Sequence, residues 1–233
     1  MDRNYKYLLL DMDMTLLDFK KSEMLAFKGV TESVGKEFSE DDYIRYSNTN
    51  EKFWLMLDKG LITRKELLAG RFAEFAKRWG EDSLHLNQIF IENLANSGDW
   101  LDGAQDFLKA LQKSGKYRTY VASNGPVVTV SGRVRASGLD RFADGVFISE
   151  EAGAPKPDPK FFEFVFDKLS DHDVSNYLMI GDRLSSDIKG ANNVNMDCVL
   201  FAHDGNLPED LKGCKVDYFA GSYKELQDLL EVP

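Results

Sequence analysis

The sequence contains only two cysteines in 233 residues, and it has no long apolar run. Cys198 and Cys214 cannot supply a disulfide framework or a four-ligand zinc site, so we expect a protein of the reducing cytoplasm. The N-terminus lacks a signal-peptide pattern, and no stretch approaches the ~18 apolar residues of a membrane-spanning helix. Repeats and low-complexity tracts are also missing. These absences argue against a secreted, zinc-binding or membrane-embedded protein.

Basic residues are outnumbered, because 29 Lys and Arg stand against 39 Asp and Glu and give a net charge of −10. This balance argues against binding to polymeric nucleic acid or to an anionic membrane. It still permits a small phosphorylated ligand, since one lysine and a bound metal can reverse the local field. A hydrophobic fraction of 43% and 12% aromatic residues exclude a disordered chain. The length allows one domain with a sizeable insertion.

Two carboxylates follow the first apolar run of the chain. The run 7–10 is followed by Asp11-Met12-Asp13-Met14-Thr15. Residues two apart in a strand share a face, so Asp11 and Asp13 point the same way unless the chain turns between them. Two such carboxylates repel each other unless a cation lies nearby, and they could serve as nucleophile or metal ligand and as proton donor. Taken alone, the pattern also fits a strand end with acidic turn residues.

Three further apolar segments run into polar residues in the same way. Their ends carry Ser123-Asn124-Gly125, the lysine of Ala154-Pro155-Lys156-Pro157, and Gly181-Asp182-Arg183 followed by Asp187. Ligands of open parallel sheets bind outside the carboxyl ends of the strands, where a Mg²⁺-phosphate site would need such groups. Taken alone, Ser123 could be a helix cap and Lys156 a solvated loop charge. Asp182 could be a turn residue, and Asp187 an acid in the first turn of a helix. The joint pattern favours a site.

The order of predicted elements indicates an α/β fold interrupted by a helical segment. Strands are predicted at 118–122, 145–149, 177–181, 197–202 and 217–220, with helices near 103–113, 126–137, 158–169, 185–194 and 222–231. Alternating βα units predict a parallel sheet with helices on both faces. From Asp18 to about Gly98 the pattern is helical. We therefore predict a core of residues 1–17 and 99–233 and a helical insertion of residues 18–98.

The insertion carries recognisable helix signals. One face of a predicted helix carries Leu68, Phe72, Phe75 and Trp79. We assign the last three to the apolar core of the insertion. Thr63 with Glu66 forms a capping box before that helix. Ser39, ahead of three acidic residues, marks another helix start.

These features together resemble the haloacid dehalogenase-like (HAD) hydrolase superfamily. Its four motifs stand in order as DMDMT, VASN, the lysine of APKPD, and GDRLSSD, and they span residues 11 to 187. The resemblance implies a Rossmann-like core with a parallel sheet flanked by helices. It also implies that the helical insertion is a C1-type cap, which in the family covers the catalytic strand ends and excludes water.

The resemblance also implies the role of each motif residue. Asp11 would form an aspartyl-phosphate, and Asp13 would protonate the leaving group and then accept a proton from water. The implied Mg²⁺ ligands are the Asp11 carboxylate, the Asp13 main-chain carbonyl and Asp182. Asp187 would hold a metal-bound water or orient the lysine. The implied phosphate-binding residues are Ser123, Asn124 through its backbone, and Lys156.

Two motif positions narrow the expected reaction. Dehalogenases of the family carry an aromatic residue in place of Asp13, and phosphonate-cleaving members carry Ala, so neither could protonate an alcohol leaving group there. Thr15 matches the phosphatase form of the motif rather than the mutase form. The resemblance therefore predicts a phosphate monoester hydrolase.

The cap segments 50–54, 60–63 and 70–72 and the core run 149–157 are similar to those of the YjjG-type pyrimidine 5′-nucleotidases, which hydrolyse nucleoside monophosphates. This likeness predicts a 5′-nucleotidase in nucleotide metabolism, monomeric or a small homo-oligomer. The alternatives are a phosphatase of another small metabolite, such as phosphoglycolate or a sugar phosphate, and a non-catalytic interaction protein. A base could stack on an aromatic face and bond to polar groups. The candidates for these contacts are Phe19, Phe53, Trp54, Asn48, Asn50 and Arg71.

Overall fold

The computed structural model describes residues 4–203, 205–206 and 208–233. Its contacts divide the chain into two compact units. One unit comprises Met1–Phe19 and Gly98–Pro233, and the other comprises Lys20–Ser97. We call them the sheet unit and the helical unit, and each is described by itself.

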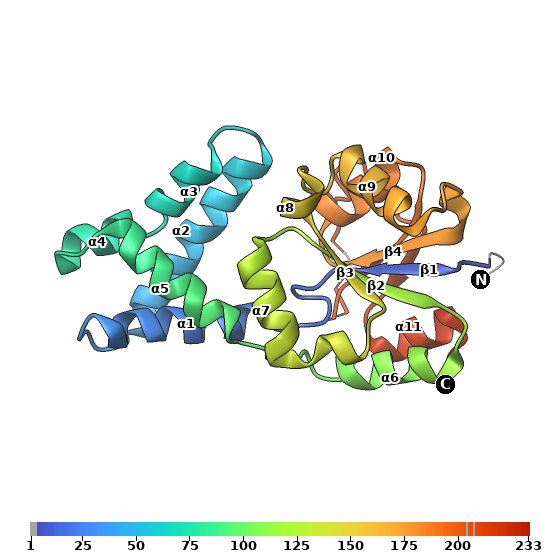
Figure 1. The fold of residues 1–233 in the computed structure, drawn as a ribbon, viewed down its shortest axis with the longest axis horizontal. Helices are drawn as coiled ribbons and strands as arrows, with labels where there is room; N and C mark the ends of the chain where they lie inside the picture. Colours follow the sequence, from blue (N-terminus) through green and yellow to red (C-terminus); the bar gives the residue numbers. More distant parts are fainter. Residues whose placement is uncertain (1–3, 204, 207) are drawn as a thin grey trace. The chain divides into compact units, whose positions relative to one another are not determined.

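The sheet unit contains a six-stranded parallel sheet in the order β3-β2-β1-β4-β5-β6 (Figure 1). Its strands are β1 Tyr7–Leu10, β2 Arg118–Ser123, β3 Gly145–Ile148, β4 Tyr177–Gly181, β5 Asp197–Phe201 and β6 Tyr218–Ala220. The first strand lies in the centre because the chain continues to β2 on one side and returns to β4 on the other. This switch point is the place where open α/β sheets bind ligands.

Helices cover both faces of the sheet, as the alternation in the sequence predicted. The helices are α6 Ala104–Ser114, α7 Val127–Ser137, α8 Ser149–Ala152, α9 Pro159–Leu169, α10 Lys189–Asn193 and α11 Tyr223–Leu230. Shorter turns occupy Leu139–Arg141, Val174–Asn176 and Leu184–Ile188. Side chains of α6, α7 and α11 pack into one apolar cluster, and those of α9 and α10 pack into the other.

The apolar strands are buried because both of their faces are covered. Leu8 and Leu10 of β1 point into the cluster of α6, α7 and α11, whereas Leu9 points into the opposite cluster. All three side chains are inaccessible to solvent, which explains why the strand reads as a continuous apolar run instead of alternating. Leu10 pairs with Val121 on one side and with Ile180 on the other. The residues that follow these three strands therefore emerge at one edge.

The helical unit is built around stacked aromatic rings. Its helices are α1 Phe19–Ser33, α2 Glu40–Asp58, α3 Arg64–Gly70, α4 Ala73–Trp79 and α5 Ser83–Ala95. The first residue of α1, Phe19, belongs to the sheet unit by its contacts. Phe27 lies in the centre, with Tyr46, Phe72 and Phe75 at ring-centroid distances of 5.0, 6.4 and 5.3 Å. All four side chains are buried. These four aromatic residues thus form its core, whereas Trp79, which was also assigned to the core, is only half-buried.

The predicted helix starts are confirmed, but one predicted helix is wrong. The Ser39 hydroxyl accepts from the N–H of Asp42, and Thr63 forms the full capping box with Glu66. The helix expected to carry Leu68 through Trp79 is broken into α3 and α4. It ends at Gly70, where a Cβ would lie 2.2 Å from the ring of Phe53, so α2 and α3 pack too closely for a side chain there. Close packing between helices overrode the regular spacing.

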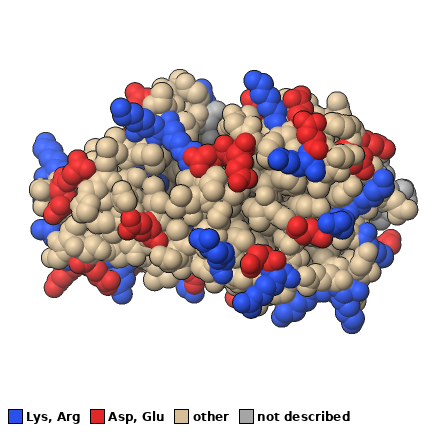
Figure 2. Space-filling model, viewed as in Figure 1, with Lys and Arg blue, Asp and Glu red and all other residues tan. Residues whose placement is uncertain are grey.

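On the face drawn in Figure 2, acidic and basic side chains are interspersed. Among the residues that the structure describes, no helix combines the length and the apolar composition needed to cross a membrane.

Candidate active site

Lys156 is a fully buried cation at the carboxyl edge of the sheet. Its side chain is 1% exposed, and its Nζ donates to Asp11 Oδ1 at 2.7 Å, to Asp187 Oδ1 at 2.6 Å and to the carbonyl of Ala122 at 2.6 Å. Burial alone would lower the pKa of Lys156, but the two carboxylates hold this pKa above its ordinary value. The lysine is therefore charged, and each of its three donors is used.

The loop that carries Lys156 is fixed by a side-chain amide. The Asn124 Nδ2 donates to the carbonyl of Lys156 at 2.7 Å, and the N–H of Lys156 donates to Asn124 Oδ1 at 2.8 Å. Both main-chain groups of the lysine are thus satisfied by one residue at the end of β2. Asn124 was predicted as a phosphate ligand through its backbone, and its side chain positions the lysine.

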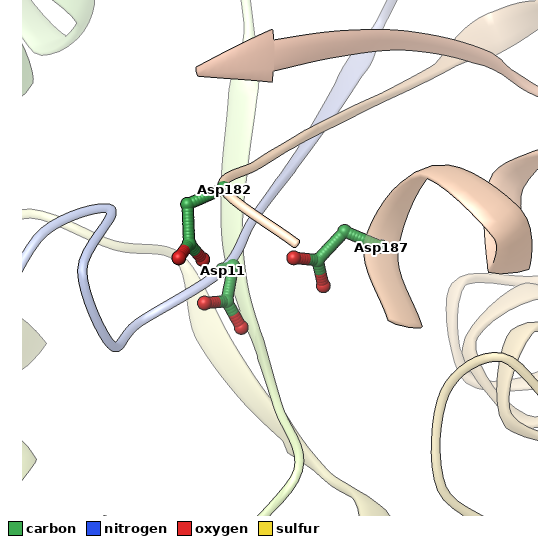
Figure 3. A group of neighbouring side chains, drawn as sticks. All are labelled: Asp11, Asp182 and Asp187. Atoms are coloured by element: carbon green, nitrogen blue, oxygen red, sulfur yellow. The ribbon is translucent and has the colours of Figure 1, made fainter. Parts of the chain in front are cut away.

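Three carboxylates converge at the same place (Figure 3). Asp11 follows β1, Asp182 follows β4, and Asp187 lies in the helical turn after β4. One oxygen from each lies within 4.8 Å of the others. Asp182 Oδ1 is buried and has no hydrogen-bond partner among the described residues. Three carboxylates beside one lysine leave a net negative charge, and oxygen donors of this kind suit a hard divalent cation.

Burial makes these carboxyls hard to ionise when no cation is bound. Desolvation, followed by the charge of Asp187, raises the pKa of Asp11 to about 7, although Lys156 partly offsets the effect. Desolvation, followed by the charge of Asp11, raises the pKa of Asp182 to about 8. Near neutral pH a cation would therefore compete with protons for this site.

Asp187 can approach the site only because residue 181 is glycine. A Cβ on Gly181 would lie 2.5 Å from the carboxyl carbon of Asp187. Asp187 is fixed from both sides, because its Oδ1 accepts from Lys156 and its Oδ2 accepts from the N–H of Arg183 at 3.0 Å. Asp187 thus contacts the lysine directly, and its role in orienting it stays a prediction. Asp187 also belongs to the acidic cluster, whereas the expected metal ligands were Asp11, Asp182 and the main-chain carbonyl of Asp13.

Asp13 lies outside that cluster because the chain turns after Asp11. The N–H groups of Leu16 and Leu17 donate to the carbonyl of Met12 at 2.9 and 2.8 Å, which closes the turn. The Asp13 carboxylate pairs with Arg133 instead, and its side chain is 37% exposed. Asp11 and Asp13, two residues apart, therefore have different surroundings.

Residues 5–195 match the family model described as haloacid dehalogenase-like hydrolase. The chain belongs to this family. The matched range contains all four sequence motifs and the whole helical unit.

Relatives within the haloacid dehalogenase-like family span nearly the full chain. The pyrimidine 5′-nucleotidase PynA of Streptococcus pneumoniae is 34% identical over 97% of this chain and 95% of its own length. The pyrimidine 5′-nucleotidase YjjG of Escherichia coli is 31% identical over 97% of this chain and 98% of its own length. The crystal structure of the HAD-hydrolase YfnB of Bacillus subtilis, described as bound to magnesium, has a TM-score of 0.89. It is 29% identical and covers 98% of this chain and 99% of its own.

The structure brings together the motif residues of this family member in the sheet unit. Ser123 is buried at the end of β2, next to the carbonyl of Ala122 that accepts from Lys156. With Asp11, Lys156 and Asp182, it lies at the one edge where the central strands end. The plain interpretation of Lys156 as a solvated loop charge is wrong, because its side chain is buried.

Two residues predicted to contact substrate are bound inside the helical unit. Asn50 Nδ2 donates to Glu23 Oε1 at 2.7 Å, and Asn50 Oδ1 accepts from Arg71 Nη1 at 3.2 Å. Arg71 Nε donates to Asn87 Oδ1 at 2.7 Å, and its guanidinium lies 4.7 Å from the Phe90 ring centroid. Glu23, Asn50, Arg71 and Asn87 are each at most 5% exposed. We call these four residues the buried polar network, and in this arrangement their polar groups bond to each other.

The remaining candidates for substrate contact have other surroundings. Phe19 belongs to the sheet unit, and its ring centroid lies 5.5 Å from the Arg133 guanidinium carbon. Phe53 and Trp54 are half-buried on α2, and Asn48 is exposed on the same helix. Contacts of these residues with a substrate remain a prediction.

Sequence reasoning missed Arg133, the buried partner of Asp13. Arg135, two positions further along the same helix, is the same residue type and is exposed. The signal would have been the helical spacing, because Arg133 lies three and four positions from the buried Val130 and Thr129. An arginine on an apolar helix face needs a charged partner.

We predict that Asn124→Leu lowers the free energy of unfolding by about 2–4 kcal/mol, because it leaves both main-chain groups of Lys156 unpaired. Asn192→Leu is a matched control. Asn192 makes the same pair of bonds with the main chain of the exposed Lys215, at 2.9 and 2.7 Å. Its loss should cost about 1 kcal/mol, since water can replace those bonds. Urea unfolding of both variants measures the difference, and equal losses would contradict the positioning role.

We predict that Arg71→Met destabilises the protein by about 3 kcal/mol, because it removes the cation from a network that buries the Glu23 carboxyl and takes hydrogen-bond donors from Asn50 and Asn87. Arg45→Met is the control, since Arg45 forms an exposed ion pair with Glu74 at 3.9 Å. That change should cost less than about 0.5 kcal/mol. Chemical denaturation compares the two. A similar cost for both would show that the buried polar network contributes little to stability.

Proposed function

We propose that the chain hydrolyses phosphate monoesters with bound Mg²⁺, and that its substrates are pyrimidine nucleoside monophosphates. The observation that carries the reaction type is the separation of Asp11 from Asp13. One is buried beside a lysine and two further carboxylates, and the other is partly exposed outside that group. The two carboxylates are therefore separate groups that can act as nucleophile and as proton donor. The substrate class rests on the two nucleotidase relatives and on the cap sequence.

The first half-reaction transfers the phosphoryl group to the protein. An Asp11 oxygen attacks phosphorus, and the bond from phosphorus to the leaving oxygen breaks. Asp13 gives its proton to that oxygen, so an alcohol departs and an aspartyl-phosphate remains. Lys156, which already donates to Asp11, would turn one N–H toward a phosphoryl oxygen beside the Ser123 hydroxyl.

The second half-reaction restores the protein. Water attacks phosphorus from the side that the alcohol left, and Asp13 takes its proton. Phosphate leaves, and the Asp11 carboxylate is regenerated. When bound, Mg²⁺ would be held by Asp11, Asp182 and the main-chain carbonyl of Asp13, and it would supply positive charge that offsets the phosphate oxygens. The partnerless Asp182 oxygen and the excess of carboxylates fit this cation.

We expect kcat/KM to be highest for UMP, dUMP or dTMP in a comparison that also includes CMP, AMP, GMP, phosphoglycolate and common sugar phosphates. Phosphate release with Mg²⁺ measures it. Asp11→Asn should abolish turnover. Asp13→Asn should lower the rate of phosphate release about 100-fold or more. It should retain Mg²⁺ binding, because the metal needs only the main-chain carbonyl of residue 13. If kcat/KM is highest for a compound that is not a nucleotide, the proposed phosphatase reaction stands. The proposed substrate is then that metabolite instead of a pyrimidine nucleotide. No release from any ester would refute the proposed reaction.

We expect Mg²⁺ to bind more tightly as the pH rises from about 6 to about 8, by about tenfold per unit for each proton displaced. Asp11 and Asp182, with pKa values of about 7 and about 8, hold protons that the metal must replace. Because these pKa values are raised above those of the unfolded chain, the two carboxyls contribute most to the stability of the metal-free protein below about pH 4. That contribution is lost as the pH rises through about 7 and about 8.

Melting temperatures with EDTA and with Mg²⁺ at about pH 6 and about pH 8.5 measure both effects. The increase in melting temperature caused by Mg²⁺ should be larger at the higher pH. In Asp182→Asn this increase should be smaller at every pH, because one titrating ligand is gone. A stabilisation by Mg²⁺ that does not change with pH would show that these carboxyls are not its ligands.

A further inference from the structure

Arg133 reaches the proposed proton donor from the interior of the sheet unit. Its side chain is 1% exposed, and its Nη1 donates to Asp13 Oδ1 in a close ion pair. Asp13 is the carboxylate that faces it, on the turn after β1. A buried guanidinium is fixed in place more firmly than an exposed carboxylate, so the arginine determines where the carboxylate lies.

The helix that carries Arg133 is anchored at both ends. At the start of α7, the N–H of Val127 donates to Glu150 Oε2 at 2.7 Å. At its end, Trp100 Nε1 donates to the carbonyl of Ser137 at 3.1 Å. Gly98 packs against the same end so closely that a Cβ would lie 2.3 Å from the Ser137 nitrogen. Arg133 therefore extends from a rigid element, which is what a precisely held functional group requires.

The ion pair is made through one nitrogen of the guanidinium. Its Nε and Nη2 are buried and have no hydrogen-bond partner within the described part of the chain. Its other neighbour is the Phe19 ring, 5.5 Å away. Arginine and carboxylate commonly pair through two parallel bonds, which would satisfy more of these donors. The single contact forgoes that stabilisation and leaves the second oxygen of Asp13 without a bond to the arginine.

We propose that Arg133 is a positioning residue that holds Asp13 by Oδ1 so that Oδ2 exchanges the proton with the leaving oxygen. This inference rests on the proposed phosphatase function. As the phosphorus–oxygen bond breaks, the leaving oxygen takes the proton from Oδ2, and the electron pair of the broken O–H bond stays on Asp13 as a carboxylate. Arg133 faces the charge that develops there. When water attacks the aspartyl-phosphate, its proton returns to the same oxygen.

The test compares two esters of similar size that differ in their need for a proton. Benzyl phosphate releases an alkoxide that must be protonated, whereas 4-nitrophenyl phosphate releases a stabilised phenolate. With enzyme in excess and Mg²⁺ present, the first turnover measures cleavage of the ester alone. Arg133→Met should slow this turnover about 100-fold for benzyl phosphate and less than about threefold for 4-nitrophenyl phosphate. A merely structural role would slow both equally.

Arg135→Met is the matched control, because it removes an exposed arginine from the same helix, and both rates should stay unchanged. Arg133→Lys keeps one charged donor and should recover part of the benzyl phosphate rate. It also serves as the test if Arg133→Met does not fold, since its loss should again be confined to benzyl phosphate. Equal losses on both esters, or a gain on benzyl phosphate, would overturn the inference. Failure of the unaltered protein to release phosphate from any ester, the nucleotides included, would instead refute the phosphatase itself.

Discussion

The site depends on one buried ammonium group, that of Lys156. Without it, Asp11 and Asp187 would be two buried carboxylates with no positive partner, and such groups remain protonated or do not stay buried. The lysine satisfies both and also bonds to the carbonyl of Ala122, so it joins β1, β2 and the turn after β4. Its own position is set by the Asn124 amide. Removing this cation would therefore disturb the charge balance and the geometry of the strand ends together.

A single short turn separates the chemistry of the two motif aspartates. Had β1 continued as a strand, Asp13 would have shared the face of Asp11 and added a fourth carboxylate to a site that already carries excess negative charge. The turn closed on the Met12 carbonyl instead directs Asp13 to Arg133, on the face where α7 packs. Asp11 thus shares Lys156 with Asp187, whereas Asp13 pairs with Arg133.

The sequence was sufficient to predict the sheet, its flanking helices and the residues at the strand ends, because these follow from local apolar runs and motif spacing. It was insufficient where long-range packing decides. The break between α3 and α4 arises where Phe53 meets Gly70, a contact between two helices that periodicity cannot reveal. Asn50 and Arg71 looked like ligand contacts because polar residues among aromatic ones suggest a binding surface. Their partners, Glu23 and Asn87, are distant in sequence. Arg133 was missed for the same reason.

The buried polar network also bears on how substrate selection could arise in the helical unit. Asn50 and Arg71 form hydrogen bonds with each other, with Glu23 and with Asn87. Replacing these bonds by bonds to a ligand would leave buried polar groups of the network unpaired. Such residues specify the shape of the unit more readily than they contact a base. The proposed selection among nucleotides then falls to side chains that neither the core nor this network uses. The ring of Phe53 already packs against Gly70, whereas Trp54 is half-buried on α2, and stacking needs a free face and no hydrogen bond. In this proposal, substitution of such a residue would change the substrate while the sheet unit keeps the reaction.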